Sequence, residues 1–292
     1  MASEGDRRAD PEVERRSRLL GGLHLEGEGA RGVAIALLST AVFLTVVVVA
    51  VTQSAGWPEV KRSFFDWGDI SSSFPDIARA FVLNVKIFLV CEVCILVLAL
   101  VIAVLRSLPG PVFFPLRALA VIYADLARGV PTILVIALLG FGAPALELTG
   151  VPRSRVFWAG LGLILVYSGY VSEVYRAGIE SVHPSQEAAA RSLGLSRFQA
   201  LRRVILPQAI RRVIPPLLND FIGLQKDTAL VGVLGSVEAF KQSQIEVSTD
   251  FNFTHYLVAA TLFVAITIPL ARFTDWLIAR DRRRRQAAGG FA

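Results

Sequence analysis

Long apolar runs, separated by short polar links, occupy most of the chain. We mark six of them, at 33–52, 77–105, 116–143, 156–180, 211–235 and 254–279. Each has at least the roughly 20 residues that a helix needs to cross a hydrocarbon core about 30 Å thick. None alternates between apolar and polar positions, as the strands of a membrane barrel do. The pattern predicts an all-α fold, a polytopic transmembrane helical bundle of about six spans.

The segments outside these runs divide the chain further. Residues 1–32 are polar and charged, which predicts a disordered cytoplasmic tail. The run at 33–52 lies too far from the start for a cleavable signal, so we expect an extra N-terminal transmembrane helix. The main transmembrane domain is expected at 77–279, with a cytoplasmic link at 183–210, and a basic cytoplasmic tail is expected at 280–292.

Arginine accounts for most of the net charge of +6, in a chain that is 54% hydrophobic with a mean hydropathy of +0.57. The arginines stand at the ends of the apolar runs, not in one stripe that a nucleic acid could follow. Those before residue 33, at 106–117, at 181–210 and at 282–285 share one side if both termini are inside the cell. We therefore expect a multi-pass protein of the bacterial plasma (inner) membrane, in contact with the lipid bilayer, with cytoplasmic termini and no nucleic-acid partner.

The link at 181–210 leaves the apolar pattern and predicts two short helices. Good helix formers fill 186–193, Gly194 ends that helix, and Ser196 is a suitable N-cap for a second one. The second helix carries an apolar stripe and is expected to close or kink at Pro207. Two interpretations are open at this point: the stripe enters the groove of a partner protein, or the arginines hold the link on anionic lipid headgroups.

The residue identities around the link favour the partner protein. Six segments stand in one order: ARGVPT at 127–132, YSGYVSEVYRAGIESV at 167–182, GLSRFQALRRVILP at 194–207, QA at 208–209, PPLLN at 215–219 and KDTAL at 226–230. With these segments, the chain from residue 125 onward resembles the membrane permease subunit of ABC importers for polar amino acids, of the histidine and glutamine type. One such match would be weak, but the ordered series is specific.

The resemblance implies a fold like that of type I ABC importer permeases and a role as one membrane subunit of an ATP-driven, binding-protein-dependent importer for polar amino acids or related compounds. It implies three partners: an ABC ATPase dimer, a second permease subunit in a homodimer or heterodimer, and an extracytoplasmic amino-acid-binding protein. The chain has no GxxxxGK[ST] phosphate-binding loop. We therefore expect a transport subunit and not an enzyme, with no cofactor of its own and with ATP and Mg in the partner ATPase.

The resemblance also assigns an ATPase-coupling loop, made of Glu187, Ala188, Ala189, Ala190, Gly194, Val204, Leu206 and Pro207. One position departs from the family pattern, in which an acidic residue and two alanines precede the glycine by a fixed spacing. Counting back from Gly194 puts Ala188 at the acidic position, so Glu187 stands one residue early. One residue turns a side chain by about 100° on a helix. Whether Glu187 replaces the shifted glutamate stays open.

Charged residues inside the apolar runs are candidates for a substrate pathway, because ionisable groups at membrane depth are costly. Asp125 and Arg128 are three residues apart, as are Glu173 and Arg176, so each pair can meet on one helix face. In the fifth run, Pro215-Pro216 is expected to break the helix near its start. The alternative is that these charges only neutralise one another between helices.

A zwitterionic substrate needs donors for its carboxylate and acceptors for its ammonium. We expect the donors among Arg128, Gln225 and Lys226. We expect the acceptors among Asp125, Tyr167, Glu173 and Asp227, with Asn219 as a further polar group.

Two other classes of protein fit the residues less well. An ion-coupled secondary transporter of a small charged solute would explain the charges inside the runs, but not the link at 183–210 or the ordered motifs. A membrane enzyme would need a nucleophile with its base, or a metal cluster, and no histidine lies deep in a run. The pair Cys91 and Cys94 is expected to pack as small apolar side chains.

Overall fold

The computed structural model describes residues 30–289, which form two compact units divided between Val60 and Lys61. The first unit contains α2 (Ala30–Thr52), a helix that covers the run predicted at 33–52. Side chains 33–52 are all exposed, and a helix that is apolar on every face suits lipid. The disordered tail predicted at 1–32 lies outside the described residues up to position 29, and the helix begins at Ala30.

The second unit consists of helices, with no strand in the part of the chain that is described. The short helix α3 (Trp57–Phe64) spans the division between the units. The remaining α-helices are α4 (Trp67–Ser107), α5 (Phe114–Gly129), α6 (Thr132–Ala137), α7 (Ala143–Ala145), α8 (Arg155–Glu180), α9 (Pro184–Ser192), α10 (Arg197–Ala200), α11 (Leu206–Asp227), α12 (Ala239–Asp250) and α13 (Thr254–Gly289). Two π-helical segments, η1 (Leu138–Gly142) and η2 (Leu201–Ile205), and a 3-10 helix, η3 (Thr228–Leu234), join some of them.

Four helical stretches are long and apolar enough to cross a membrane: Gly32–Thr52, Trp57–Ser107, Arg155–Glu180 and Thr254–Arg280. A fifth is added if Phe114–Gly129 and Thr132–Ala145 count as one span, which is bent by 103°. The span predicted over 116–143 therefore consists of two helices with a sharp bend between them and is not one continuous helix. Val130 adopts an extended backbone before Pro131, because a proline disfavours helical geometry in the residue that precedes it.

The fifth predicted span, 211–235, also differs from the structure. Helix α11 begins earlier, at Leu206, runs through Pro215 and Pro216 without the predicted break, and changes to the 3-10 helix η3 after Asp227. Helix α11 is not among the described helices that are long and apolar enough to cross a membrane. Some of its polar side chains face neighbouring helices, as Gln225 does by accepting a hydrogen bond from Thr267 on α13 at 2.9 Å.

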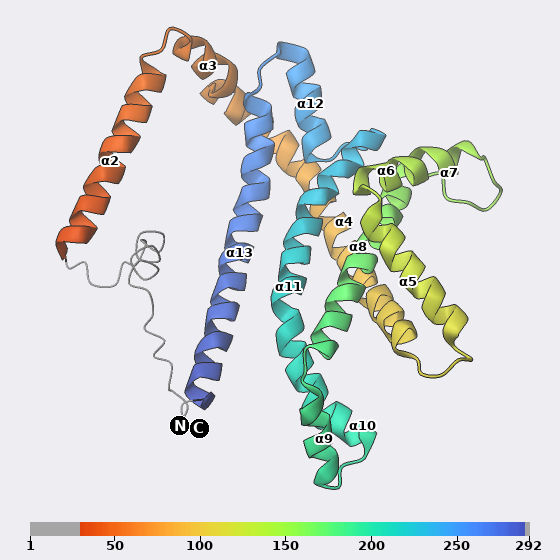
Figure 1. The fold of residues 1–292 in the computed structure, drawn as a ribbon. Helices are drawn as coiled ribbons and strands as arrows, with labels where there is room; N and C mark the ends of the chain where they lie inside the picture. Colours follow the sequence, from red (N-terminus) through yellow and green to blue (C-terminus); the bar gives the residue numbers. More distant parts are fainter. Residues whose placement is uncertain (1–29, 290–292) are drawn as a thin grey trace, which may run out of the picture. The chain divides into compact units, whose positions relative to one another are not determined.

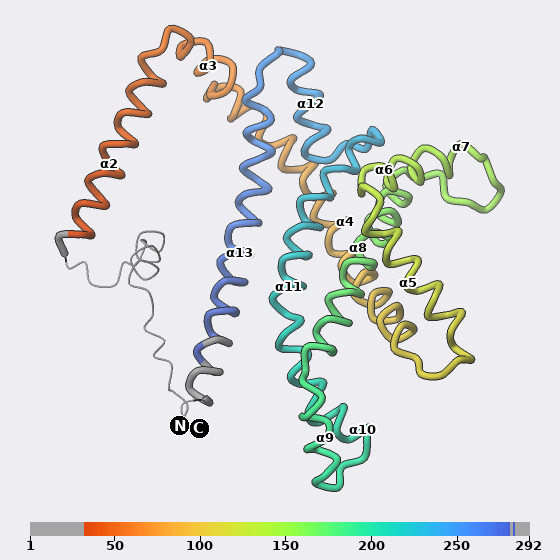
Figure 2. The backbone as a smooth tube through the Cα atoms, viewed as in Figure 1, coloured from red at the N-terminus to blue at the C-terminus, as the bar shows by residue number. Residues whose placement is uncertain are grey.

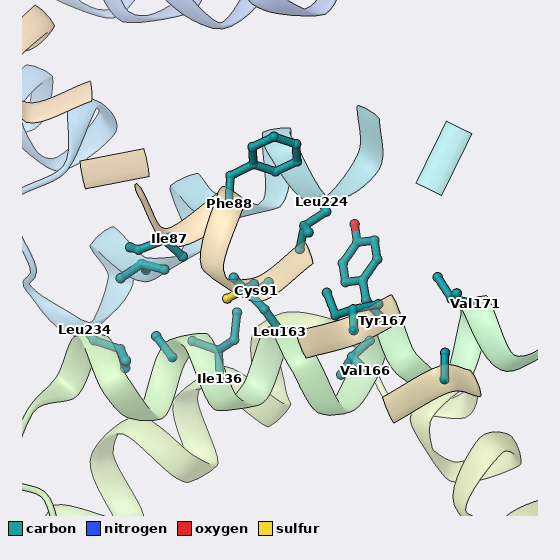
Figure 3. Close-up of a cluster of buried hydrophobic side chains, with 14 residues drawn as sticks. Ile87, Phe88, Cys91, Ile136, Leu163, Val166, Tyr167, Val171, Leu224 and Leu234 are labelled. Carbon is teal, nitrogen blue, oxygen red and sulfur yellow. The ribbon is translucent and has the colours of Figure 1, made fainter. Parts of the chain in front are cut away.

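Helices α4, α8 and α11 pack around the main core of the second unit (Figure 1). Leu163 of α8 and Leu224 of α11 are fully buried there, and Phe88 of α4 packs its ring edge-on against Phe221 at 4.4 Å. Cys91 is buried in the same cluster with Sγ 3.6 Å from the Gly160 carbonyl oxygen, as predicted for a small apolar side chain, whereas Cys94 is exposed. Figure 3 shows Tyr167 among these side chains, with its hydroxyl on the side of Leu224.

A group of buried hydrogen bonds joins α4 to the start of α12. The Asn84 amide donates to Thr228 Oγ1 at 3.2 Å and to Glu238 Oε2 at 3.0 Å, and its oxygen accepts from the Ala239 N–H at 3.1 Å. Glu238 is fully buried and caps α12, accepting from two further backbone N–H groups. Buried polar groups are costly unless they are paired, so this pairing ties η3 and α12 to α4.

The turn between α12 and α13 returns to the first residues of the second unit. The Phe253 N–H donates to the Ser63 carbonyl at 2.8 Å, and His255 Nε2 lies 2.8 Å from Asp250 Oδ2. Burial alone would raise the pKa of the Asp250 carboxyl, but hydrogen bonds from the His255 ring and the Asn252 N–H lower it overall. After this turn, α13 extends to Gly289, so the predicted tail at 280–292 is helical as far as it is described. Figure 2 shows the coloured part of α13 as one continuous helix beside α11.

Candidate functional site

The segment predicted as a coupling loop is a helical hairpin made of α9 and α10. It projects beyond the ends of α8 and α11, away from the rest of the second unit (Figure 1). His183 is the N-cap of α9, with Nδ1 accepting from the Ser185 N–H at 3.2 Å. The two helices predicted from the sequence are therefore present, on either side of Gly194.

Gly194 shapes the turn of the hairpin. Its φ is +85°, a left-handed conformation that costs other residues roughly 1–2 kcal/mol. Its N–H donates to the Arg191 carbonyl at 2.9 Å, and the Leu195 N–H donates to the Ala190 carbonyl at 3.2 Å. Together these two bonds form a Schellman motif, which satisfies carbonyls that the end of α9 would otherwise leave free.

Ser196 begins the second helix, as the sequence predicts. Its Oγ accepts from the Gln199 N–H at 3.2 Å, while Gln199 Oε1 accepts from the Ser196 N–H at 2.9 Å, a complete capping box. The chain then widens into the π-helical segment η2 and continues as α11 without ending at Pro207. Of the two predicted effects of Pro207, closing the helix does not occur, because the proline lies in the first turn of α11, where a missing N–H is tolerated.

The hairpin buries small residues and exposes large apolar ones. Ala190 and Ala200 are buried, whereas Ala188, Ala189 and Pro207 are exposed and Val204 is partly buried. Leu193 is 84% exposed, Phe198 is 68% exposed and Leu206 is 42% exposed. Large apolar side chains exposed on a projecting hairpin are typical of a surface that docks into another protein.

Glu187 pairs within the hairpin. Its Oε1 lies 3.8 Å from Arg197 Nε, and the two residues come from opposite arms, α9 and α10. The pair is partly exposed, so its contribution to stability is small, on the order of 0–1 kcal/mol. The shifted glutamate therefore has a partner of its own inside the chain.

The hairpin is fastened to the bundle at its base. Arg212 of α11 donates through Nη1 to the Ser181 carbonyl at the end of α8. Gly178 lets these helices approach closely, because a Cβ there would lie 2.0 Å from Val213 Cγ2. The hairpin thus joins α8 to α11 where the two helices are in close contact.

A second group of polar residues surrounds Glu173 on α8. Arg106 Nη1 lies 2.7 Å from Glu173 Oε1, and Arg176 Nε lies 2.7 Å from Oε2. Arg128 Nη2 lies 2.9 Å from Asp125 Oδ1 and 3.8 Å from Glu173. The two predicted pairs are therefore confirmed, and the structure adds Arg106, which the sequence analysis missed because it stands at the far end of another helix.

A third group lies between α4, α8 and α11. The Tyr167 hydroxyl donates to Asp227 Oδ2 at 2.9 Å, and Gly223 leaves room for that hydroxyl, since a Cβ there would lie 3.1 Å from it. Two more acidic residues on these helices are partly buried, Glu92 of α4 and Asp220 of α11. The Asp220 Oδ2 atom is buried and has no hydrogen-bond partner among the described residues.

The sequence analysis did not select Glu92 or Asp220, although each is a lone acid in an apolar stretch. That signal could have found them, because an intramembrane acid is a functional candidate by default. The remaining predicted residues of α11 do not join the Tyr167 group. Asn219 and Lys226 are exposed, and Gln225 is buried against Thr267 of α13.

Comparison with known proteins identifies the family to which the chain belongs. Residues 96–285 match the family model described as "Binding-protein-dependent transport system inner membrane component". The chain belongs to this family of binding-protein-dependent permeases. It is 34% identical over 204 residues to the Probable amino-acid permease protein YxeN of Bacillus subtilis (strain 168), which covers 70% of this chain and 90% of that protein. It is 37% identical over 183 residues to the Probable glutamine ABC transporter permease protein GlnM of the same organism. That match covers 62% of this chain and 82% of GlnM.

Solved structures agree with the permease fold. A chain of the structure titled "Crystal structure of an amino acid ABC transporter with histidines" superposes with a TM-score of 0.67 at 27% identity, covering 74% of this chain and 98% of that one. A chain of the inward-facing MetNI methionine ABC transporter superposes with a TM-score of 0.54 at 17% identity. The match covers 70% of this chain and 95% of that chain, and it supports the fold alone.

The family match includes the hairpin and the Glu173 group. It begins after Glu92 and does not include α2. As a member of this permease family the chain is a transport subunit of the inner membrane, and the secondary-transporter alternative is set aside.

Proposed function

We propose that the chain provides the membrane path of an ATP-driven importer and that the α9–α10 hairpin couples this path to a separate ATPase dimer. The observation that carries the proposal is the hairpin itself, which projects from the bundle with Leu193 and Phe198 exposed. Apolar anchors on a short helix suit the groove of a partner protein. In this proposal ATP and Mg bind the partner, and the eight predicted coupling residues lie on or beside the docking surface.

The base of the hairpin supports coupling as well as docking. Gly178 and Val213 hold α8 and α11 in close contact directly above the hairpin. A movement of the ATPase against Leu193 would therefore shift both helices, and these helices carry Tyr167, Asp220 and Asp227. Glu187 is expected to stay with Arg197 and to contribute little to the contact with the ATPase.

We infer that the cargo is a polar amino acid or a related compound with a cationic group. The relatives' printed names point to amino acids or glutamine. Glu92, Asp220 and Asp227 are partly buried in the bundle and would accept hydrogen bonds from an ammonium group, and Tyr167 already donates to Asp227. Asp125 and Glu173 are weaker candidates than the sequence suggested, because Arg106, Arg128 and Arg176 already pair with them.

The carboxylate of such a substrate still needs donors. Arg128 and Lys226 stay candidates, since both side chains are partly or fully exposed within the unit. The full transporter in this proposal contains a second permease subunit, identical or related, and an extracytoplasmic amino-acid-binding protein. Both termini would be cytoplasmic in this proposal.

The hairpin can be tested without disturbing the fold. The double substitution Leu193→Glu and Phe198→Glu alters two exposed side chains, and each apolar anchor buried in a groove is worth roughly 1.5–3 kcal/mol. We expect co-purification of the ATPase to fall at least about tenfold, as deletion of 187–200 or Gly194→Pro should also do. Val112→Glu, at an 82% exposed apolar residue outside the hairpin, is the matched control. Undiminished co-purification of the double variant would contradict the docking assignment.

A further inference from the structure

An open depression lies at the ends of α4, α5 and α8, outside the hairpin and outside the Tyr167 group. Its volume is about 500 Å³, and it is lined by three arginines and by apolar residues of α5: Arg106, Arg117, Arg176, Phe114, Ala118, Val121 and Ile122. Arg106 lies in the last turn of α4, Arg117 in the first turns of α5, and Arg176 close to the end of α8. The depression is therefore on the same side of the bundle as the hairpin, which follows α8.

The positive charge of the three arginines that line the depression is not fully balanced by carboxylates. Arg106 and Arg176 share Glu173, and Arg176 also pairs with Glu180. Arg117 donates through Nη1 to the Leu108 carbonyl at 2.8 Å, and no carboxylate among the described residues pairs with it. Three guanidinium groups thus face two carboxylates, which leaves a net positive charge at the mouth of the depression.

The start of α5 adds to this positive field. No side chain caps the helix, and its first turn contains no acidic residue. The N-terminus of a helix carries about half a positive charge and attracts anions. The helix has 16 residues, and its first turn forms one wall of the depression beside Arg117.

The other wall is apolar and exposed. Phe114 and Ile122 are more than half exposed, and Val121 is 38% exposed. One ligand combines an anionic head with long apolar chains at the edge of a membrane: an anionic phospholipid. Basic pockets between membrane helices on the cytoplasmic side bind such headgroups.

We propose that this depression is a binding site for an anionic phospholipid of the cytoplasmic leaflet. The phosphate lies between Arg106, Arg117 and Arg176, and an acyl chain follows Val121 and Ile122. The lipid would fill the space between the ends of α4, α5 and α8 and would provide a negative charge for Arg117. This site is separate from the hairpin and from the proposed substrate path.

The test uses the full chain purified in mild detergent, so that it does not depend on the ATPase. The chain is incubated with phosphatidylglycerol or with phosphatidylcholine, and the lipid that stays bound is measured by native mass spectrometry. We expect phosphatidylglycerol to stay bound in preference to phosphatidylcholine. Arg117→Gln should weaken its binding about fivefold, the loss expected for one arginine near an anionic headgroup.

A second variant and a control complete the design. Ala118→Glu keeps all three arginines but puts a carboxylate in the depression, and it should abolish the preference for phosphatidylglycerol. Arg79→Gln is the control, because Arg79 is 78% exposed near the other end of α4 and pairs with Asp76. Equal phosphatidylglycerol binding by the wild type and both depression variants would overturn the proposal. So would displacement of the lipid by millimolar inorganic phosphate, because the site would then bind a free anion.

Discussion

Arg106 and Glu173 are 67 residues apart in the sequence, yet Arg106 Nη1 lies 2.7 Å from Glu173 Oε1 with both side chains largely buried. The contact joins the last turn of α4 to the C-terminal third of α8. Arg176 reaches the other carboxylate oxygen at 2.7 Å, so Glu173 is held from two sides. A carboxylate with two guanidinium partners has little capacity left for a substrate ammonium, and we interpret Glu173 as a structural centre of the bundle.

Replacing this carboxylate should destabilise the fold. Glu173→Gln leaves Arg106 with a buried and uncompensated charge, and breaking a buried pair costs roughly 3–5 kcal/mol. We expect a clear drop in the unfolding midpoint of the purified chain in detergent. Asp76→Asn, at an exposed pair with Arg79, should cost less than about 1 kcal/mol. Equal midpoints for the two variants would show that Glu173 does not hold these helices.

The left-handed backbone of Gly194 predicts a specific sensitivity. In the Gly194→Ala variant, an alanine that keeps the φ of +85° destabilises the turn by roughly 1–2 kcal/mol. If the strain unfolds the Schellman turn, ATPase binding should weaken about five- to thirtyfold. Gly110→Ala is a matched control, because Gly110 has φ +87° in the link between α4 and α5, outside the hairpin. Similar ATPase affinities for the two variants would contradict the role of the hairpin.

The acids Glu92 and Asp220 predict an unusual combination of effects. Glu92→Gln and Asp220→Asn each replace a partly buried carboxylate by a neutral amide, and burying a charge is costly, so the unfolding midpoint should stay unchanged or rise. Uptake of a polar amino acid by the reconstituted transporter should fall about ten- to a hundredfold, the loss expected for one charge-assisted hydrogen bond.

Asp275→Asn controls for the loss of a charge, because Asp275 lies on α13 and is 64% exposed. The substrate assignment fails if uptake by the Glu92 and Asp220 variants matches this control. A fall in stability would instead assign the two acids a structural role.

The turn between α12 and α13 should loosen in acid. The folded protein lowers the pKa of Asp250, so this carboxylate stabilises the fold above the ordinary aspartate value of about 3.9. That contribution is lost as the pH falls through the lowered pKa, because the folded state then has to take up the proton. Asp250 is 39% exposed, so the effect should stay below about 1 kcal/mol.

The acid effect can be measured as the unfolding midpoint between about pH 5 and pH 3. Asp250→Asn should be less stable than the wild type at pH 5 and should show a shallower decline. Parallel curves for the two proteins would rule out a contribution from the Asp250–His255 contact.

Part of the hairpin could be predicted from local sequence alone. Ser196 caps a helix and Gly194 ends one because both effects depend on a few neighbouring backbone groups. The Asp125–Arg128 and Glu173–Arg176 pairs follow in the same way from the spacing of side chains on one helix. Pro215-Pro216 misled the prediction, because the helix through them packs against α8 and α13.

The sequence by itself determined the helical class of this protein, its apolar runs and its membership of a permease family, since these depend on composition and on the order of motifs. Only the tertiary structure decided which charges meet. It brought Arg106 to Glu173, Asn84 to Glu238 and Tyr167 to Asp227, across separations of 67, 154 and 60 residues. Such contacts depend on how helices cross and on the room that residues such as Gly223 leave between them. No local pattern in the chain encodes that geometry.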